Sequence, residues 1–405
     1  MPTSPDMIPQ TTHARAALAR DPGIDALRGL SIVLVVLHHV GLRIGLKHSV
    51  LAPLVPKWIL DAFIWNGPEA VFVFFVISGF LIASNTIARW GSLAQVQAGA
   101  FYRRRAARIL PCLLVLVAVL CVLDLAGFKD WAIDTTKQSL ARTVLAALGM
   151  HLNWYEGAAT RSYLPANWNV LWSLSIEEAF YLAFPIACLL LGRTRLLAPL
   201  LALLALSLPF TREHLRGQGN DIWYEEAYLP GMAAIALGVL AAMALARRPV
   251  VARRTANLML ALGVVGLVSV LFFEGELWRS LKEGLMLVLT GAAAALLLGL
   301  RWRRAAGVGA PSRAFGWLRG FGRLSYEIYL THMFVVWPLV YAWRASGLGD
   351  AWGFVFYLPV LAASWALGWL VARGLSGPCE RWLARAFAPR PGAFAEVATI
   401  HPQTT

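Results

Sequence analysis

The stretch Asp25-Ala-Leu-Arg-Gly-Leu-Ser-Ile-Val-Leu-Val-Val-Leu-His-His39 decides how this chain folds. It is apolar enough to enter a membrane, yet it carries Arg28 near one end and His38 and His39 at the other. Ionisable side chains in hydrocarbon are costly and usually face a partner or a water-filled cavity. On a helix, Arg28 and His39 share a face, about 20° off line and about 16 Å apart, whereas His38 points about 80° away. A packing histidine beside an arginine that reaches the membrane surface is the structural alternative.

The composition of the whole chain agrees with a membrane protein. Of its 405 residues, 59% are hydrophobic and 14% are charged, and the mean hydropathy is +0.62; a soluble protein of this length is far more polar. The apolar runs approach the roughly 20 residues that span a bilayer. The four cysteines have neither paired nor metal-ligand spacing, so we expect no disulfide framework and no metal site. We predict an all-α, polytopic integral membrane protein.

Ten membrane-spanning helices would account for the apolar runs. They are expected at about residues 24–45, 66–88, 108–127, 171–191, 195–210, 228–246, 256–273, 281–300, 322–343 and 353–374. Together they form one membrane domain over residues 24–388, between an N-terminal tail at residues 1–23 and a C-terminal tail at residues 389–405.

Basic residues fall in alternate connections between the predicted spans. Arginines gather after the second, fourth, sixth, eighth and tenth spans, where acidic residues are almost absent, and the other connections mix both signs. This positive-inside pattern predicts that both termini are cytoplasmic. It also explains the net charge of +14 connection by connection, so the charge gives no reason to expect a nucleic-acid partner.

A cluster of arginines enters the third span from the predicted cytoplasmic side. Arg104 and Arg108 share a helix face, and Arg105 lies one step away. Such a cluster can hold phosphate groups through bidentate contacts. It can equally anchor the helix at the membrane surface, and the stretch alone favours neither role.

Glu177 is the candidate for a functional carboxylate in the fourth span. Its neighbour Glu178 follows Ser175 at the spacing of a capping box, which is a structural role at a helix start. Glu177 has no such role, and it shares a helix face with Ser173 and Tyr181. We therefore expect Glu177, rather than Glu178, to act in a functional site.

Two further spans carry polar side chains among apolar ones. Ser78 and Gly79 interrupt the second span, where small residues let a helix or a ligand approach; helix packing is the more common role. In the ninth span, Tyr326, Tyr329 and His332 recur at intervals of three. That face suits either hydrogen bonds between helices or the wall of a substrate site.

These stretches, in this order, resemble those of the membrane acyltransferase family 3, the bacterial O-acyltransferases of the inner membrane. The matching residues are Asp25, Arg28, Gly29 and His39; Phe74–Phe80; Arg104, Arg105, Arg108, Ile109 and Pro111; Trp172, Ser173, Leu174 and Glu177; and Gly322, Ser325, Tyr326, Tyr329, Leu330 and His332. Each match alone is weak, but five in order across most of the chain are specific. Many members have an acidic residue where this chain has Phe72, and an arginine and an aspartate that residues 229–234 lack. The identity of the acceptor is therefore not carried over.

The resemblance implies an O-acyltransferase of the bacterial inner membrane. It would move an acyl group, acetyl in the first place, from cytoplasmic acyl-CoA to a hydroxyl of an extracytoplasmic or membrane-linked glycan. Acyl-CoA would be a co-substrate, with no permanently bound cofactor. Succinyl transfer or a small-molecule acceptor is the enzymatic alternative, and a transporter or flippase without acyl transfer is the alternative of another class. The oligomeric state, the acceptor and the acyl chain do not follow from the resemblance.

This interpretation assigns a role to each candidate residue. His39 acts as general base on the acceptor hydroxyl, Glu177 orients His39 or stabilises its charged form, and Arg28 holds donor phosphate or stabilises the oxyanion. An acyl-histidine intermediate is an open alternative to direct transfer. The phosphates of acyl-CoA are expected on Arg104, Arg105 and Arg108. The weaker substrate-binding candidates are Ser78, Tyr326, Tyr329 and His332.

Overall fold

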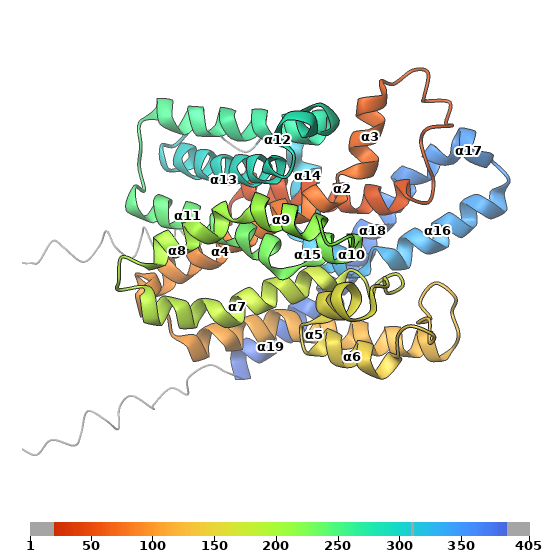
Figure 1. Cartoon of the computed structure of the whole chain (residues 1–405), viewed down its shortest axis with the longest axis horizontal. Coiled ribbons are helices and arrows are strands. Elements are labelled where there is room, and N and C mark those ends of the chain that lie inside the picture. The colour runs from red at the N-terminus through yellow and green to blue at the C-terminus, as the bar shows by residue number, and fades with distance from the viewer. Residues whose placement is uncertain (1–19, 309–311, 387–405) are drawn as a thin grey trace, which may run out of the picture.

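The computed structural model describes residues 20–308 and 312–386, which are folded into helices (Figure 1). No β-strand occurs within these two ranges, so the predicted all-α fold is confirmed. The helices are α2 (Pro22–Gly41), α3 (Lys57–Trp65), α4 (Gly67–Trp90), α5 (Ala98–Leu125), α6 (Leu140–Leu148), α7 (Leu171–Leu191), α8 (Leu197–Leu206), α9 (Leu208–Arg216), α10 (Asp221–Glu226), α11 (Tyr228–Arg247), α12 (Arg253–Leu281), α13 (Gly284–Ala305), α14 (Gly316–Arg323), α15 (Ser325–Thr331), α16 (Met333–Ser346), α17 (Gly349–Trp352), α18 (Tyr357–Val371) and α19 (Gly377–Ala386). Most of the predicted N-terminal tail and all of the C-terminal tail lie outside the described residues.

Eight stretches of the described chain are helical, long and apolar enough to cross a membrane. They are Pro22–Gly41, Gly67–Trp90, Ala98–Leu125, Leu171–Leu191, Asp221–Arg247, Arg253–Leu281, Gly284–Ala305 and Gly349–Leu383. These stretches make the chain a multi-pass membrane protein by length and composition.

The two remaining predicted spans are interrupted. The span at residues 195–210 is divided between α8 and α9, and Pro209 in the first turn of α9 cannot donate a helical hydrogen bond. The span at residues 322–343 is divided among α14, α15 and α16, with breaks at Leu324 and His332. The count of ten spans therefore stays a prediction.

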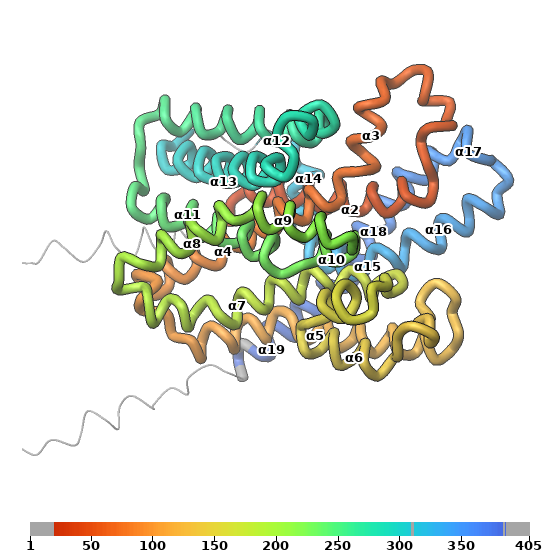
Figure 2. The backbone as a smooth tube through the Cα atoms, in the orientation of Figure 1, coloured from red at the N-terminus to blue at the C-terminus, as the bar shows by residue number. Residues whose placement is uncertain are grey.

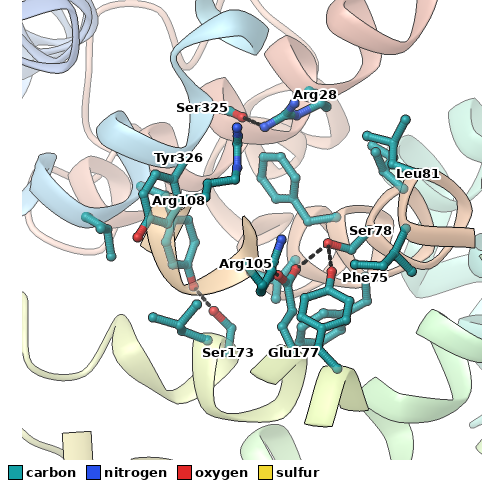
Figure 3. A pocket seen from close by; sticks show the side chains of 18 of the residues that line it. Arg28, Phe75, Ser78, Leu81, Arg105, Arg108, Ser173, Glu177, Ser325 and Tyr326 are labelled. Atoms are coloured by element: carbon teal, nitrogen blue, oxygen red, sulfur yellow. Dashed lines mark hydrogen bonds and ion pairs between the residues drawn. The ribbon is translucent and has the colours of Figure 1, made fainter. Parts of the chain in front are cut away.

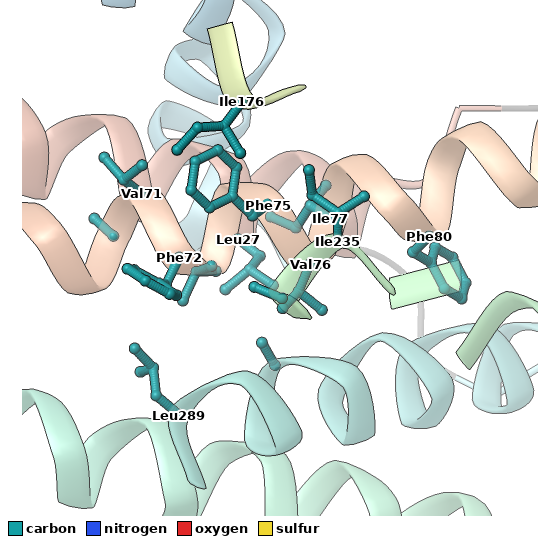
Figure 4. Packing of buried hydrophobic residues seen from close by; sticks show 14 of the residues in the cluster. Leu27, Val71, Phe72, Phe75, Val76, Ile77, Phe80, Ile176, Ile235 and Leu289 are labelled. Atoms are coloured by element: carbon teal, nitrogen blue, oxygen red, sulfur yellow. The ribbon is translucent and has the colours of Figure 1, made fainter. Parts of the chain in front are cut away.

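The core of the molecule forms where α4 crosses α11 (Figure 4). A Cβ atom on Gly79 would lie 1.9 Å from the carbonyl oxygen of Ile235, and one on Gly238 would lie 2.0 Å from that of Val76. Only glycine permits this approach of the two backbones, as is common where helices pack in membranes. The close helix contact expected at Gly79 is thus present, and it fixes the position of Ser78 beside it.

Connections of different charge lie at opposite ends of the molecule (Figure 2). The connection from α7 to α8 and that from α11 to α12 lie at one end, and both are rich in arginine. Helices α3 and α17 and the chain that follows α5 lie at the other end. The alternation seen in the sequence is therefore also a separation in space, whereas the orientation of the two ends in a membrane stays a prediction.

Candidate active site

Arg28 lies in the first half of α2 and is the first residue of the candidate site along the chain. Its Nη2 donates a hydrogen bond of 2.8 Å to Oγ of Ser325, the first residue of α15 (Figure 3). Both residues line a cavity of about 340 Å³. We call it the arginine cavity, and its polar lining includes Arg28, Ser78, Arg105, Arg108, Glu177 and Tyr326.

A hydrogen-bonded network around Glu177 forms one wall of the arginine cavity. Glu177 accepts from Ser78 Oγ at 2.8 Å and pairs with Arg105 Nη2 at 3.2 Å. Tyr181 donates to Ser78 Oγ at 2.7 Å, and Arg105 also donates to Glu178 at 3.0 Å. Two carboxylates therefore share one guanidinium, and α4, α5 and α7 are held together at this wall (Figure 3).

The predicted capping box at Ser175 is wrong. Helix α7 begins at Leu171, so Ser175 lies in its second turn, where its hydroxyl donates to the Leu171 carbonyl at 3.2 Å. The same oxygen accepts from the Leu152 amide at 3.1 Å. Ser175 therefore fixes the chain after α6, and Glu178 serves Arg105 instead of a helix start.

The three predicted phosphate-binding arginines separate in the structure. Arg105 and Arg108 line the arginine cavity, whereas the exposed Arg104 lies outside it, with its guanidinium 5.9 Å from the ring centre of Trp90. Within residues 20–308 and 312–386, neither Arg28 nor Arg108 has a carboxylate in ion-pair contact. Two of the three guanidinium groups in the arginine cavity are therefore not neutralised by those residues.

His39 belongs to a second, larger cavity of about 910 Å³. We call it the histidine cavity, and its lining includes His39, Glu69, Arg212, Glu226, Trp278 and Tyr329. Val71 and Tyr329 line both cavities, and the Tyr329 hydroxyl lies 2.6 Å from Ser173 Oγ. Arg28 and His39 therefore face different cavities that share part of one wall.

His332 is the aromatic partner of His39. Their ring centres lie 5.0 Å apart, and His332 is fully buried. His332 Nδ1 lies 2.8 Å from the Tyr329 carbonyl oxygen, which can only accept, so this nitrogen carries a proton. Neither Nε2 of His332 nor Nδ1 of His39 has a hydrogen-bond partner among the described residues. The two rings thus bring two unsatisfied nitrogens into one buried region.

Glu177 does not contact His39 in this structure. The side-chain hydrogen bonds of Glu177 to described residues go to Ser78 and Arg105, and the rings packed on His39 are those of His38 and His332. His38 has its own partner, because its Nδ1 lies 2.6 Å from the Ile64 carbonyl oxygen. An orienting role for Glu177 on His39 would therefore need a rearrangement or an intervening molecule.

Three of the four weaker substrate-binding candidates line a cavity, and the fourth packs on a residue that does. Ser78 and Tyr326 line the arginine cavity, Tyr329 lines both, and His332 lies behind His39. The Tyr326 hydroxyl donates to the Ile109 carbonyl at 3.2 Å, which ties α15 to α5. The face of the ninth predicted span thus makes helix contacts and lines a cavity at the same time.

Sequence reasoning missed the charged residues of the histidine cavity. They are Arg43, Glu69, Arg212, Arg216, Glu225, Glu226 and Glu274. Most lie at the ends of helices, where charged residues are ordinary, so the sequence carried no signal that distinguished them. Glu69 also lies at a helix end, in the first turn of α4, where a carboxylate is favourable, so its position carried no stronger signal than those of the others.

The chain belongs to the acyltransferase 3 family. A family model described as an acyltransferase domain matches residues 21–373, which include both cavities. The resemblance drawn from the motifs is therefore confirmed.

Two curated O-acetyltransferases are similar to part of this chain. The O-acetyltransferase OatA of Staphylococcus aureus (strain NCTC 8325 / PS 47) is 30% identical over 169 residues, which are 41% of this chain and 24% of the relative. The peptidoglycan O-acetyltransferase OatA of Listeria monocytogenes serovar 1/2a is 28% identical over 169 residues, 40% of this chain and 23% of the relative. The matched region thus spans about a quarter of the length of these curated relatives. No solved structure matches this chain.

Proposed function

We propose that this protein is a membrane O-acyltransferase that moves an acyl group, acetyl in the first place, from acyl-CoA to a glycan hydroxyl. The observation that carries the proposal is the pair of cavities that share Val71 and Tyr329. One is lined by Arg28, Arg105 and Arg108, and the other contains His39 together with both acidic and basic side chains. A donor and an acceptor can therefore occupy separate places and meet at one wall.

The arginine cavity is the proposed place of the donor. Arg28 and Arg108 lack carboxylate partners within the described ranges, and guanidinium groups bind phosphate through paired charge-assisted hydrogen bonds. Acyl-CoA is polyanionic, so its phosphates would be held there while the thioester extends toward Tyr329. Arg105 is already shared by Glu177 and Glu178, which suits it to hold the wall together.

His39 is the proposed general base in the histidine cavity. It takes the proton of the acceptor hydroxyl while the oxygen attacks the thioester carbonyl carbon. The new carbon–oxygen bond forms, the carbon–sulfur bond breaks, and the departing thiolate takes up a proton to give free CoA. The unpartnered Nε2 of His332 offers a second acceptor for a proton in the same region. Attack by His39 itself, through an acyl-histidine, balances equally.

The setting of the reaction is part of the proposal. We infer a multi-pass protein of the bacterial inner membrane with both termini in the cytoplasm, because the basic connections gather at one end. The name of the Listeria relative, a peptidoglycan O-acetyltransferase, supports a cell-wall glycan as the acceptor class. Succinyl transfer and small-molecule acceptors remain the enzymatic alternatives, and transport without acyl transfer the alternative of another class.

The test is release of free CoA from acetyl-CoA by the purified full chain in detergent, with and without candidate glycans. We expect His39→Ala to lower the rate at least ~100-fold, the usual contribution of a general base. The matched control is His214→Ala, because His214 is exposed and lines neither cavity.

Either of two results would count against this function. Unchanged CoA release by the His39→Ala protein would remove His39 from the chemistry. A wild-type protein that neither binds nor consumes several acyl-CoA donors, with glycans present, would make transport the leading function.

A further inference from the structure

We propose that the acceptor carries a protonated amine as well as a hydroxyl, as an amino sugar with a free amine does. The inference rests on the proposed function and adds the chemical class of the acceptor. The amine would bind in the histidine cavity at Glu69, with Glu226 as a second carboxylate of the same cavity. The hydroxyl would then lie at His39, which lines that cavity too.

The first observation is that both carboxylates are buried and incompletely bonded. Glu69 is 5% exposed and Glu226 is 1% exposed. Oε2 of each has no hydrogen-bond partner in the part of the chain that the structure describes. A buried carboxylate is costly unless it gains a proton or a cation. Both side chains line a cavity large enough for a ligand that supplies the cation.

The position of Glu69 offsets part of the cost of burying its carboxylate. Glu69 lies in the first turn of α4, and the N-terminus of a helix stabilises negative charge. A bound ammonium group would add to this effect and stabilise the ionised carboxylate, which burial alone disfavours.

Among the described residues, the cavity's own cations contact groups other than Glu69 and Glu226. Arg212 Nε lies 2.8 Å from Glu283 and Arg216 Nε lies 2.5 Å from it, so one buried carboxylate holds both guanidinium groups. Arg43 donates to the His39 carbonyl at 2.7 Å and stacks on Trp337. These contacts leave the carboxylates of Glu69 and Glu226 for a cation from outside.

A metal ion fits this cavity less well than an ammonium group. Among the residues that the structure describes, no three His, Cys, Asp or Glu side chains are grouped to hold a metal. An ammonium group needs one carboxylate and benefits from aromatic faces. Trp65, Trp172, Tyr163 and Trp278 line the same cavity. Its volume of about 910 Å³ is at the upper end of ordinary ligand pockets, roughly 300–1,000 Å³.

The test compares three sugars as acceptors for the purified full chain with acetyl-CoA. They are D-glucosamine, D-glucose and D-glucuronate, which present a cationic, a neutral and an anionic group. We expect kcat/KM for D-glucosamine to exceed that for D-glucose at least tenfold, with an ester as the product. Glu69→Gln, which keeps the size of the side chain, should lower that ratio at least fivefold. Glu213→Gln is the matched control, because Glu213 is exposed and outside the cavity.

The outcomes separate this inference from the proposed function. No preference for D-glucosamine, or no response to it while acetyl-CoA is still consumed through His39, overturns the inference alone. A preference for D-glucuronate also overturns it and assigns acceptor choice to Arg212. Loss of the D-glucosamine preference in the Glu69→Gln protein, with an unchanged melting temperature, supports it. A wild type without any use of acyl-CoA overturns both.

Discussion

Neighbouring arginines on α5 differ in what they face, and this difference can be measured. Both Arg103 and Arg108 are exposed, but only Arg108 lines the arginine cavity. We expect Arg108→Ala to raise KM for acetyl-CoA about tenfold or more, because a charge-assisted hydrogen bond to phosphate contributes about 1.5–3 kcal/mol. KM is measured by CoA release at several donor concentrations.

Arg103→Ala provides the control for that measurement. It removes the same charge from the same helix, so a general electrostatic effect would raise KM in both proteins alike. An equal rise in the two variants would show that the arginine cavity does not hold the donor. A rise confined to Arg108→Ala would assign the phosphate contact to the cavity.

At the level of single residues, the sequence predicted which residues line a cavity better than it predicted which residues contact one another. Arg28, His39 and Glu177 were predicted from polarity within apolar runs, and each lines a cavity. Arg104 lies outside both, because helix periodicity does not say which side faces a neighbour. The contact between His39 and His332 joins α2 to the break after α15, and no local pattern predicts such a long-range pair.

At the level of helices, the crossing of α4 and α11 depends on the absence of a side chain. We expect Gly238→Ala to lower the melting temperature of the purified protein by several degrees, because its Cβ would lie 2.0 Å from the Val76 carbonyl oxygen. Overpacking of this kind commonly costs about 1–3 kcal/mol. The measurement is thermal unfolding in detergent followed by tryptophan fluorescence.

Gly291→Ala is the matched substitution in α13. A Cβ atom on Gly291 would meet no atom within 4 Å, and alanine is the better helix former. We expect this variant to melt at or above the temperature of the wild type. If both variants melt alike, close backbone approach is not what holds α4 against α11.

Two of the predicted spans are interrupted in the structure. They show why the number of spans was harder to predict than the presence of apolar runs. Hydropathy identifies an apolar run, but the run at residues 322–343 folds as α14, α15 and α16. Its breaks place Ser325 against Arg28 and His332 against His39. These contacts come from packing between distant parts of the chain, which a pattern read along one run does not contain.

The stability of the whole molecule should depend on pH through Glu156. Burial raises the pKa of Glu156 to about 8, while hydrogen bonds from the Leu164 amide and Asn169 act against that rise. Between the ordinary value of 4.5 and about 8, the folded protein keeps a proton that the unfolded chain has lost. The free energy of unfolding therefore falls as pH rises through this interval.

Melting curves between pH 5 and pH 9 test this prediction. Because Gln stays neutral, Glu156→Gln should reduce the fall in melting temperature with rising pH. This variant should melt several degrees above the wild type at pH 9. Glu213→Gln, at an exposed position, should show the same dependence of melting temperature on pH as the wild type. Parallel curves for Glu156→Gln and wild type would mean that Glu156 does not carry the proton uptake.

Val71 and Tyr329, which line both cavities, would also separate the two substrates. On the proposed function, the coenzyme stays on one side of these residues and the acceptor on the other, and only a two-carbon group changes sides. An external polymer could therefore be acylated with a group made inside the cell. No pore would have to open through which ions would discharge the membrane potential. On the same function, a bulkier acyl group would need more room beside these two residues, so their size would restrict the length of the acyl chain.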